Sequence, residues 1–274
     1  MLKIEVIPDI KGRFNLCEFC PELKNINCNA TVDWNGEATY NYSKLGHIKY
    51  KFKSTDKVYI NFETLECDKL SFKHNIRLVS VNGELPRLSP GELNSMFEGC
   101  INLVEVKGML FINNREQTES KRVFKGCSVL SEPNFEAVTD LWNSKDFTEF
   151  YYGCRGIDDL HYPLFSKTQC SSVEIVDGMF AETPYLKEVR GTLLDGLWNL
   201  KSAKRMFYRS GIRKMDNIFK EELHKDNYIH IDELAAECKN LKYVNPNYFA
   251  YIPFPVDIKI KKTVFRNTLA KINI

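Results

Sequence analysis

The sequence predicts an α/β repeat protein, with stacked coils of one short parallel strand each and a β-rich cap at the N-terminal end. A motif of an aromatic, a small polar, a leucine and a valine residue recurs at steps of 27, 27, 29, 27 and 28 residues. Its apolar side chains keep fixed offsets, and the residues before it alternate as strands do. Fixed periods of roughly 20–50 residues are typical of solenoids, whose coils bury their apolar faces against one another.

Residues 1–70 are predicted to form the β-rich N-terminal cap. Residues 2–7 alternate like a strand, and residues 30–34 and 37–42 flank Asn35-Gly36, a strong hairpin signal. Residues 47–52 and 57–62 also alternate. The segment LCEFCPELKNI, at 16–26, echoes the repeat with Cys20 in the cysteine position, so this part of the chain can also hold degenerate repeats.

Residues 71–246 carry the repeat, which is clearest in SMFEGCINLVEV at 95–106. We call the position of Cys100 the anchor. The seven anchors are Asn75, Cys100, Cys127, Cys154, Thr183, Ser210 and Cys238. An aromatic residue stands three positions before all but the last of them, leucine or isoleucine follows three positions after most, and a further apolar residue follows six after most. These columns are the expected core, and each strand is expected to centre on the sixth residue after its anchor.

The anchor side chains are all small and carry a hydrogen-bonding atom. Buried backbone groups need such partners, so the anchors are predicted to bond the backbone of neighbouring coils. The chain has nine cysteines, an odd number, and four of them are anchors. We therefore expect reduced, structural thiols and no disulfide framework.

The pattern Phe-x-x-Cys-x-x-Leu-x-x-Val resembles the BspA-like leucine-rich repeats of bacterial surface proteins and some protist proteins. The resemblance covers about residues 71–244, and it departs from the family in its longer, uneven period and in Thr183 and Ser210. It implies a leucine-rich-repeat solenoid and a non-enzymatic role in adhesion or protein binding.

The polar runs at 115–122 and 195–205 predict short helices or irregular turns on the convex side. Residues 247–274 break the repeat and are predicted to form a C-terminal cap. In this cap YIPFPVDIKIKK has two prolines that block further strand pairing, and TVFRNTLAKINI is a final helix or strand that covers the last coil.

Stacking would place the neighbours of each strand centre in exposed ladders. The candidate binding residues on these ladders are Glu105, Lys107, Glu132, Asp159, His161, Glu188, Arg190, Lys214 and Tyr243. A third ladder becomes basic toward the C-terminus; its members are Val104, Ser131, Asp158, Lys187, Arg213 and Lys242. Two interpretations stay open: a solvated ladder whose charges compensate one another, and a surface that binds an elongated partner.

Motifs for catalysis are few. The sequence has no phosphate loop, dinucleotide fingerprint or HExxH, and none of its five histidines lies beside a nucleophile motif. Cys17 and Cys20, with Cys28, are candidate zinc ligands, but the second cysteine pair of a zinc site is missing. We predict no cofactor, and a metal-dependent enzyme using this cysteine cluster is the alternative from a different class.

Composition limits the partners and the location. A net charge of +2 with 27% charged residues indicates no nucleic-acid partner, and no apolar run is long enough for membrane insertion. The start MLKIEVIPDI lacks the apolar core of a signal peptide, so synthesis in a cytoplasm is expected.

We therefore predict a non-enzymatic protein that binds a protein or a cell-surface glycan. A phage virion component would reconcile an adhesin-like repeat with cytoplasmic synthesis. A cytosolic scaffold and a structural subunit of a larger assembly are the alternatives.

Overall fold

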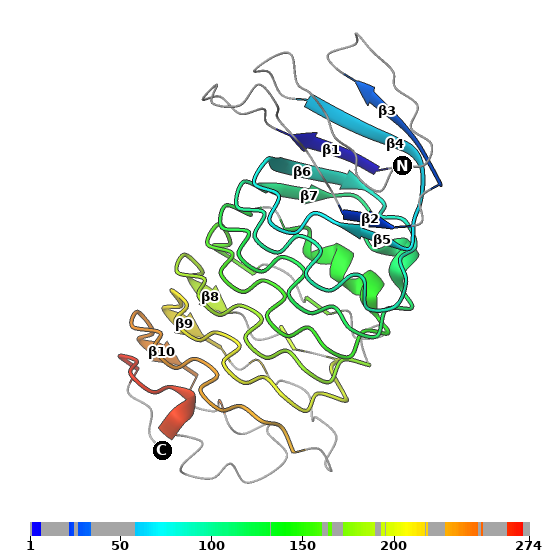
Figure 1. Cartoon of the computed structure of the whole chain (residues 1–274). Helices are drawn as coiled ribbons and strands as arrows, with labels where there is room; N and C mark the ends of the chain where they lie inside the picture. Colours follow the sequence, from blue (N-terminus) through cyan, green and yellow to red (C-terminus); the bar gives the residue numbers. More distant parts are fainter. Residues whose placement is uncertain are drawn as a thin grey trace.

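The structure is a computed structural model, and it describes residues 2–6, 22–24, 27–33, 58–131, 133–160, 164–165, 172–189, 193–194, 196–216, 218, 228–245, 248 and 262–270. The described chain advances in sequence order from a sheet at its N-terminal end, through a stack of coils, to its C-terminal end (Figure 1). Neighbours in the stack are therefore segments about one repeat apart in the sequence.

The N-terminal strands form a five-stranded sheet in the order β3-β4-β1-β6-β7. β1 (Leu2–Val6) lies between β4 (Val58–Glu66) and β6 (Leu78–Gly83) and is antiparallel to both. β3 (Asn27–Asp33) pairs antiparallel with β4, and β7 (Glu105–Lys107) pairs parallel with β6. A separate antiparallel pair joins β2 (Glu22–Lys24) and β5 (Lys69–Ser71).

This sheet contains part of what the sequence predicts for residues 1–70. The strand expected over 2–7 forms as β1, and the segments 30–34 and 57–62 overlap β3 and β4. Residues 37–42, 47–52 and Cys20 lie outside the described residues. β1 joins the N-terminal strands directly to the first coil, because it pairs with β6 along its whole length.

The coils contribute short parallel strands at the expected place. β8 (Glu188–Val189), β9 (Lys214–Met215) and β10 (Tyr243–Val244) form a parallel sheet in the order β10-β9-β8. The residues six after the anchors pair directly, except that Met215 stands one position early; the pairs are Val81 with Val106, Val189 with Met215, and Met215 with Val244. In the coil of Cys127 this position is Pro133, which has no N–H to donate to such a ladder.

The aromatic column forms the centre of the core. Its rings stack nearly parallel from coil to coil, with centroids 5.1 to 6.0 Å apart and interplanar angles of at most 14°. The members are Phe72, Phe97, Phe124, Tyr151, Phe180 and Phe207, and all are buried. Burying each ring stabilises the fold by about 2–3 kcal/mol, and each stacked pair adds about 0.5–1.5 kcal/mol.

The backbone turns twice into the left-handed region in six successive coils, at the residues five and one before the anchor. Their φ angles lie between 53° and 75° in the coils anchored from Cys100 to Cys238. Between these turns, alternate N–H groups donate to the next coil, and the others donate three residues back in their own coil. In the coil of Cys127 the inter-coil bonds are Arg122 N to Thr148 O, Phe124 N to Phe150 O and Gly126 N to Tyr152 O, at 2.7–2.9 Å.

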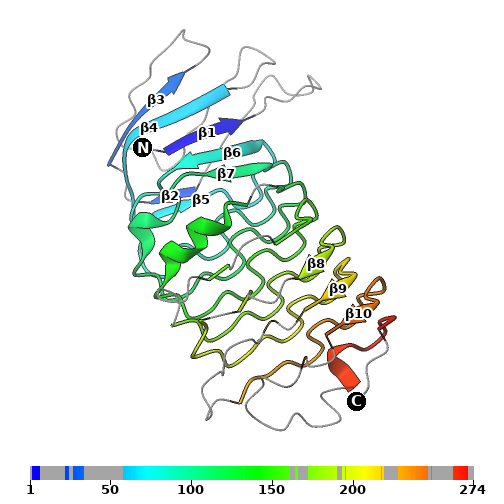
Figure 2. The same cartoon turned by 180° about the vertical axis from the view of Figure 1, so that it is seen from behind.

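This hydrogen bonding explains why helix content is lower than an α/β class implies. N–H groups that donate to the next coil cannot donate four residues back in an α-helix. The described residues contain two 3-10 helices, η1 (Ile112–Asn114) and η2 (Phe135–Leu141), and a short helical turn at 262–264. The segments 115–122 and 196–205 form turns and isolated bridges, one of the two outcomes predicted for them. Both views place η1 and η2 on the side of the stack away from β8–β10 (Figure 1, Figure 2).

Four of the seven predicted anchors bond the backbone of a neighbouring coil as predicted. The Sγ atoms of Cys100, Cys127, Cys154 and Cys238 each donate to the carbonyl of the aromatic residue in the preceding coil, at 3.0–3.1 Å. The other three differ. The Thr183 hydroxyl donates to the Phe180 carbonyl, and the Asn75 Oδ1 accepts from the N–H groups of Arg77 and Leu78, all within one coil. The Ser210 Oγ lies 3.3 Å from the Cys238 Sγ, a side-chain contact. All five cysteines whose side chains the structure describes, these four and Cys67, are buried and unbonded to another sulfur.

One further coil lies beyond the predicted end of the repeat at residue 246. The N–H groups of Ala235 and Glu237 donate to the carbonyls of Val264 and Arg266, in the pattern that joins the earlier coils. Asn267 has a φ of 58°, and the Thr268 hydroxyl donates to the Phe265 carbonyl, as Thr183 does to Phe180. Thr268 is therefore an eighth anchor, 30 residues after Cys238.

Candidate partner-binding surfaces

The predicted ladders lie on the flank that carries the coil strands. Ser80 pairs with Glu105 and Asn82 with Lys107 across β6 and β7, and Lys214 pairs with both Glu188 and Tyr243 across β8, β9 and β10. These strand residues and Asp159 are at least partly exposed. Glu132, His161 and Arg190 lie outside the described residues, so the ladders are described only in part.

Part of this charge is compensated within the strands. The Lys107 Nζ lies 2.5 Å from a Glu105 carboxylate oxygen, and the Lys214 Nζ lies 3.9 Å from Asp216. Lys214 also lies over the Tyr243 ring, with its Nζ 5.7 Å from the centroid. Because these groups are exposed, each ion pair contributes at most about 1 kcal/mol.

The third predicted ladder is continuous at its C-terminal end. Lys187 N donates to Asp158 O at 3.1 Å, Arg213 N to Lys187 O at 2.8 Å, and Lys242 N to Arg213 O at 3.0 Å. We call Lys187, Arg213 and Lys242 the basic ladder. All three side chains are exposed, and Lys187 pairs with Asp158 at 3.2 Å. Arg213 and Lys242 form no ion pair with any residue that the structure describes, so their charges are available to a partner.

Exposed apolar side chains gather on the same flank, closer to the N-terminal end. They stand one, two or four positions after their anchors, and we call them the apolar stripe: Ile76, Ile101, Val104, Val129 and Tyr185. Tyr185 is the most exposed, at 63%. The repeat does not fix these positions, so the periodic columns gave no sign of them, and of the five only Val104 was placed on a ladder from the sequence.

A shallow hollow of about 570 Å³ lies within the stripe. We call it the Tyr185 hollow; it is lined by Ser128, Val129, Ser131, Arg155, Gly156, Asp158, Tyr185 and Lys187. Val129, Gly156 and Tyr185 occupy the same repeat position in three successive coils. Gly156 adds no side chain to this column, so its backbone lines the hollow between two exposed apolar neighbours. The Tyr185 hollow also joins the apolar stripe to the basic ladder, because Lys187 lines it.

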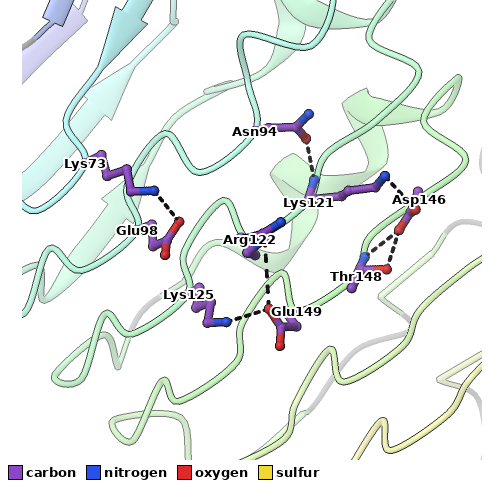
Figure 3. A network of polar contacts seen from close by, with 9 residues as sticks. All are labelled: Lys73, Asn94, Glu98, Lys121, Arg122, Lys125, Asp146, Thr148 and Glu149. Atoms are coloured by element: carbon purple, nitrogen blue, oxygen red, sulfur yellow. Dashed lines mark hydrogen bonds and ion pairs between the residues drawn. The ribbon is translucent and has the colours of Figure 1, made fainter.

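The flank that carries the left-handed turns has a different character, because its charges are paired between coils. Lys73 pairs with Glu98 at 3.0 Å, Lys125 with Glu149 at 2.6 Å and Lys121 with Asp146 at 3.2 Å, and these contacts run along the stack in Figure 3. The hydrogen bond from Lys121 to Asp146 raises the lysine pKa. Burial alone would raise the pKa of Glu98, but hydrogen bonds from Ser95 and Lys73 and the Lys73 charge lower it below its usual value. These contacts hold adjacent coils together.

A second hollow, of about 750 Å³, lies on this turn-bearing flank and has mostly paired charges. Its lining includes Lys204, Arg205, Asp232 and Glu233. Arg205 pairs with Glu233 at 2.6 Å, and Lys204 with Asp232 at 3.9 Å. Since its cations are already paired within the chain, this hollow is less suited to a charged partner than the strand-bearing flank.

The anchor thiols are not reactive groups. Burial raises the pKa of Cys100 to about 12 and of Cys238 to about 11, and it also raises those of Cys127 and Cys154. Thiolates are the nucleophilic and metal-binding form of cysteine, so these thiols stay neutral near pH 7. Within the described chain, no three His, Cys, Asp or Glu side chains gather as metal ligands would. Cys17 and Cys20 and the side chain of Cys28 lie outside the described residues.

Comparison with known proteins gives one structural similarity. The chain resembles a leucine-rich repeat protein from Bacteroides ovatus, with 18% sequence identity and a TM-score of 0.30 over 66% of this chain. The match spans 37% of the Bacteroides chain. No family model matches the sequence, and no curated protein matches it. Among the described residues, none of the helices has the length and apolar character needed to cross a bilayer.

Proposed function

We propose that this protein is a leucine-rich-repeat solenoid of the BspA-like type that binds a protein partner through its strand-bearing flank and catalyses no reaction of its own. The repeat columns, the parallel strands and the coil-to-coil hydrogen bonds support the solenoid. The observation that carries the binding role is the apolar stripe, because its side chains are exposed at related positions of successive coils.

The physical argument concerns what exposed apolar side chains gain from a partner. Single exposed apolar residues are common, whereas groups of them rimmed by polar residues often mark interaction sites. Tyrosine is also enriched among the residues that dominate binding energy, and Tyr185 stands beside a hollow that can receive a partner side chain. The turn-bearing flank lacks this combination, because its polar groups are largely bonded between coils.

Site-specific photo-crosslinking tests the proposal. A photoreactive phenylalanine analogue is placed at Tyr185 and, in a matched control, at Met109, which is 61% exposed but does not belong to the stripe. In the native context we expect a discrete crosslinked product at position 185 that is absent at 109. Val129→Asp should abolish this product without changing the melting temperature. Equal crosslinking at both positions would contradict a partner site on the stripe.

A more specific proposal, which rests on the sequence alone, concerns where the protein meets its partner. The resemblance to surface-protein repeats favours a host-surface partner, and a phage particle is one assembly that would carry the protein to such a surface. Mass spectrometry of purified particles tests the virion role directly. Absence of the protein from the particles would exclude that role and leave a cytosolic scaffold or assembly subunit.

A further inference from the structure

We propose that the apolar stripe and the basic ladder form one polarised track for an extended acidic protein segment that carries an apolar residue at one end. This inference rests on the proposed binding function and adds the chemistry of the partner. The two parts meet in the coil of Thr183, where Tyr185 belongs to the stripe and Lys187 to the ladder. The apolar residue would occupy the Tyr185 hollow, and the acidic residues would follow the basic ladder toward Lys242.

The dimensions fit a short extended segment. From the coil of Thr183 to that of Cys238 the basic ladder advances by two coils, or ~10 Å at the usual strand spacing. From the coil of Cys127, where the hollow begins, to that of Cys238 the track covers four coil steps, or ~19 Å. An extended peptide rises by ~3.3 Å per residue, so about six residues span this distance.

The charge of the track favours an acidic partner. Among the described residues its cations are Arg155, Lys187, Arg213, Lys214 and Lys242, and its carboxylates are Asp158, Asp159, Glu188 and Asp216. Five cations against four carboxylates leave an excess of +1. Opposite charges accelerate encounter and set the orientation of a partner more than they raise its affinity. The unpaired Arg213 and Lys242 are the strongest determinants, because no described carboxylate competes for them.

The apolar part selects a peptide over a polyanionic glycan. The Tyr185 hollow offers a partner the side chains of Val129 and Tyr185. A leucine or aromatic side chain would remove this apolar surface from water. A sulfated glycan would use the basic ladder but would leave the stripe exposed, and a neutral glycan would not use the ladder.

Fluorescence anisotropy with labelled peptides tests the inference. The probes are peptides of about eight residues with a terminal leucine and glutamate at alternate positions, made in both chain directions. Control peptides replace every glutamate by glutamine or the leucine by glycine. We expect the acidic leucine peptide to bind in one direction, and either replacement to weaken binding by about tenfold. Binding of the acidic peptide should also weaken with added salt.

Two matched triple variants distinguish binding to the track from general attraction by the net charge of the protein. Lys187→Gln/Arg213→Gln/Lys242→Gln should weaken binding by about tenfold. The control Arg87→Gln/Lys145→Gln/Lys201→Gln removes the same charge from exposed side chains that pair with Glu116 or Glu174, and it should bind as the wild type does. Tyr185→Ala should reduce the leucine peptide to the affinity of the glycine peptide. Circular dichroism confirms that each variant is folded.

Several outcomes would overturn the inference. Equal weakening by the two triple variants would show attraction by net charge alone. Binding of a chondroitin sulfate oligosaccharide, with no binding of either acidic peptide, would assign the ladder to a glycan. A crosslinked native partner at position 185, without peptide binding, would refute the acidic segment and leave the proposed function intact.

Discussion

Two glycines in adjacent coils test how closely the coils approach each other, because each can be replaced by alanine. Gly126 precedes the Cys127 anchor and has a φ of +74°, and Gly156 follows the Cys154 anchor by two positions. A Cβ on Gly126 would lie 3.8 Å from the nearest atoms, which belong to the Gly99 backbone. A Cβ on Gly156 would lie 2.5 Å from the Leu130 carbonyl oxygen and 2.7 Å from its carbon.

These distances predict different costs for alanine. Gly126→Ala meets only ordinary contacts, so it should cost about 1 kcal/mol, the conformational penalty of a left-handed alanine. Glu182, Arg209 and Glu237 already occupy the equivalent position with positive φ. Gly156→Ala requires the backbones of two adjacent coils to separate. We expect it to cost about 3 kcal/mol or more, as overpacking into a rigid neighbour does.

Urea unfolding measures the difference. The free energy of unfolding should fall by about 2 kcal/mol more for Gly156→Ala than for Gly126→Ala. Far-ultraviolet circular dichroism and tryptophan fluorescence should be recorded together, because repeat proteins can unfold in parts. Equal losses in the two variants, or a larger loss for Gly126→Ala, would refute the close approach of the coils at Gly156.

Three further predictions concern the core, the thiols and the last coil. Phe124→Ala should lower the free energy of unfolding by about 3–5 kcal/mol in urea titrations, because it leaves a cavity between Phe97 and Tyr151. Since burial favours the neutral Cys100 thiol, its stabilisation is complete below pH 9 and is lost as the pH rises toward its folded pKa of about 12. Stability measured from pH 9 to 11 should therefore fall less steeply in Cys100→Ala. Phe265→Ala should speed amide hydrogen exchange at Ala235 and Glu237, because Phe265 helps to hold the segment that accepts the hydrogen bonds of these two N–H groups. Mass spectrometry measures this exchange, which should stay unchanged in the coil of Cys100.

The sequence was informative where every coil repeats the same environment. Phe97, Cys100, Leu103 and Val106 are core residues, and their equivalents could be aligned because burial demands similar side chains at each step. The eighth coil was missed because its anchor is Thr268, 30 residues after Cys238, and the segment before it has no repeat pattern. Its signal was Phe265 three positions before a threonine, as Phe180 stands before Thr183.

The sequence alone could not decide between the two interpretations of the exposed ladders, a surface whose charges compensate one another and a surface that binds a partner. Glu105 has a lysine two residues away, and the structure brings Lys107 to it. Lys121 finds Asp146 in the next coil, whereas Arg213, in the same kind of stack, has no described carboxylate beside it. Both positions hold a basic residue in the sequence. Only the side chains that adjacent coils bring beside it decide whether its charge is paired.

The sequence by itself determined the period, the core columns and the bonding role of the four cysteine anchors, because these follow from burial requirements that recur from coil to coil. The tertiary structure decided the left-handed turns, the place of β1 between β4 and β6, and the contrast between the paired turn-bearing flank and the exposed stripe with its basic ladder. The physical reason is that ion pairing, exposure and close approach depend on distances between residues about one repeat apart. Those distances are fixed only when the coils stack.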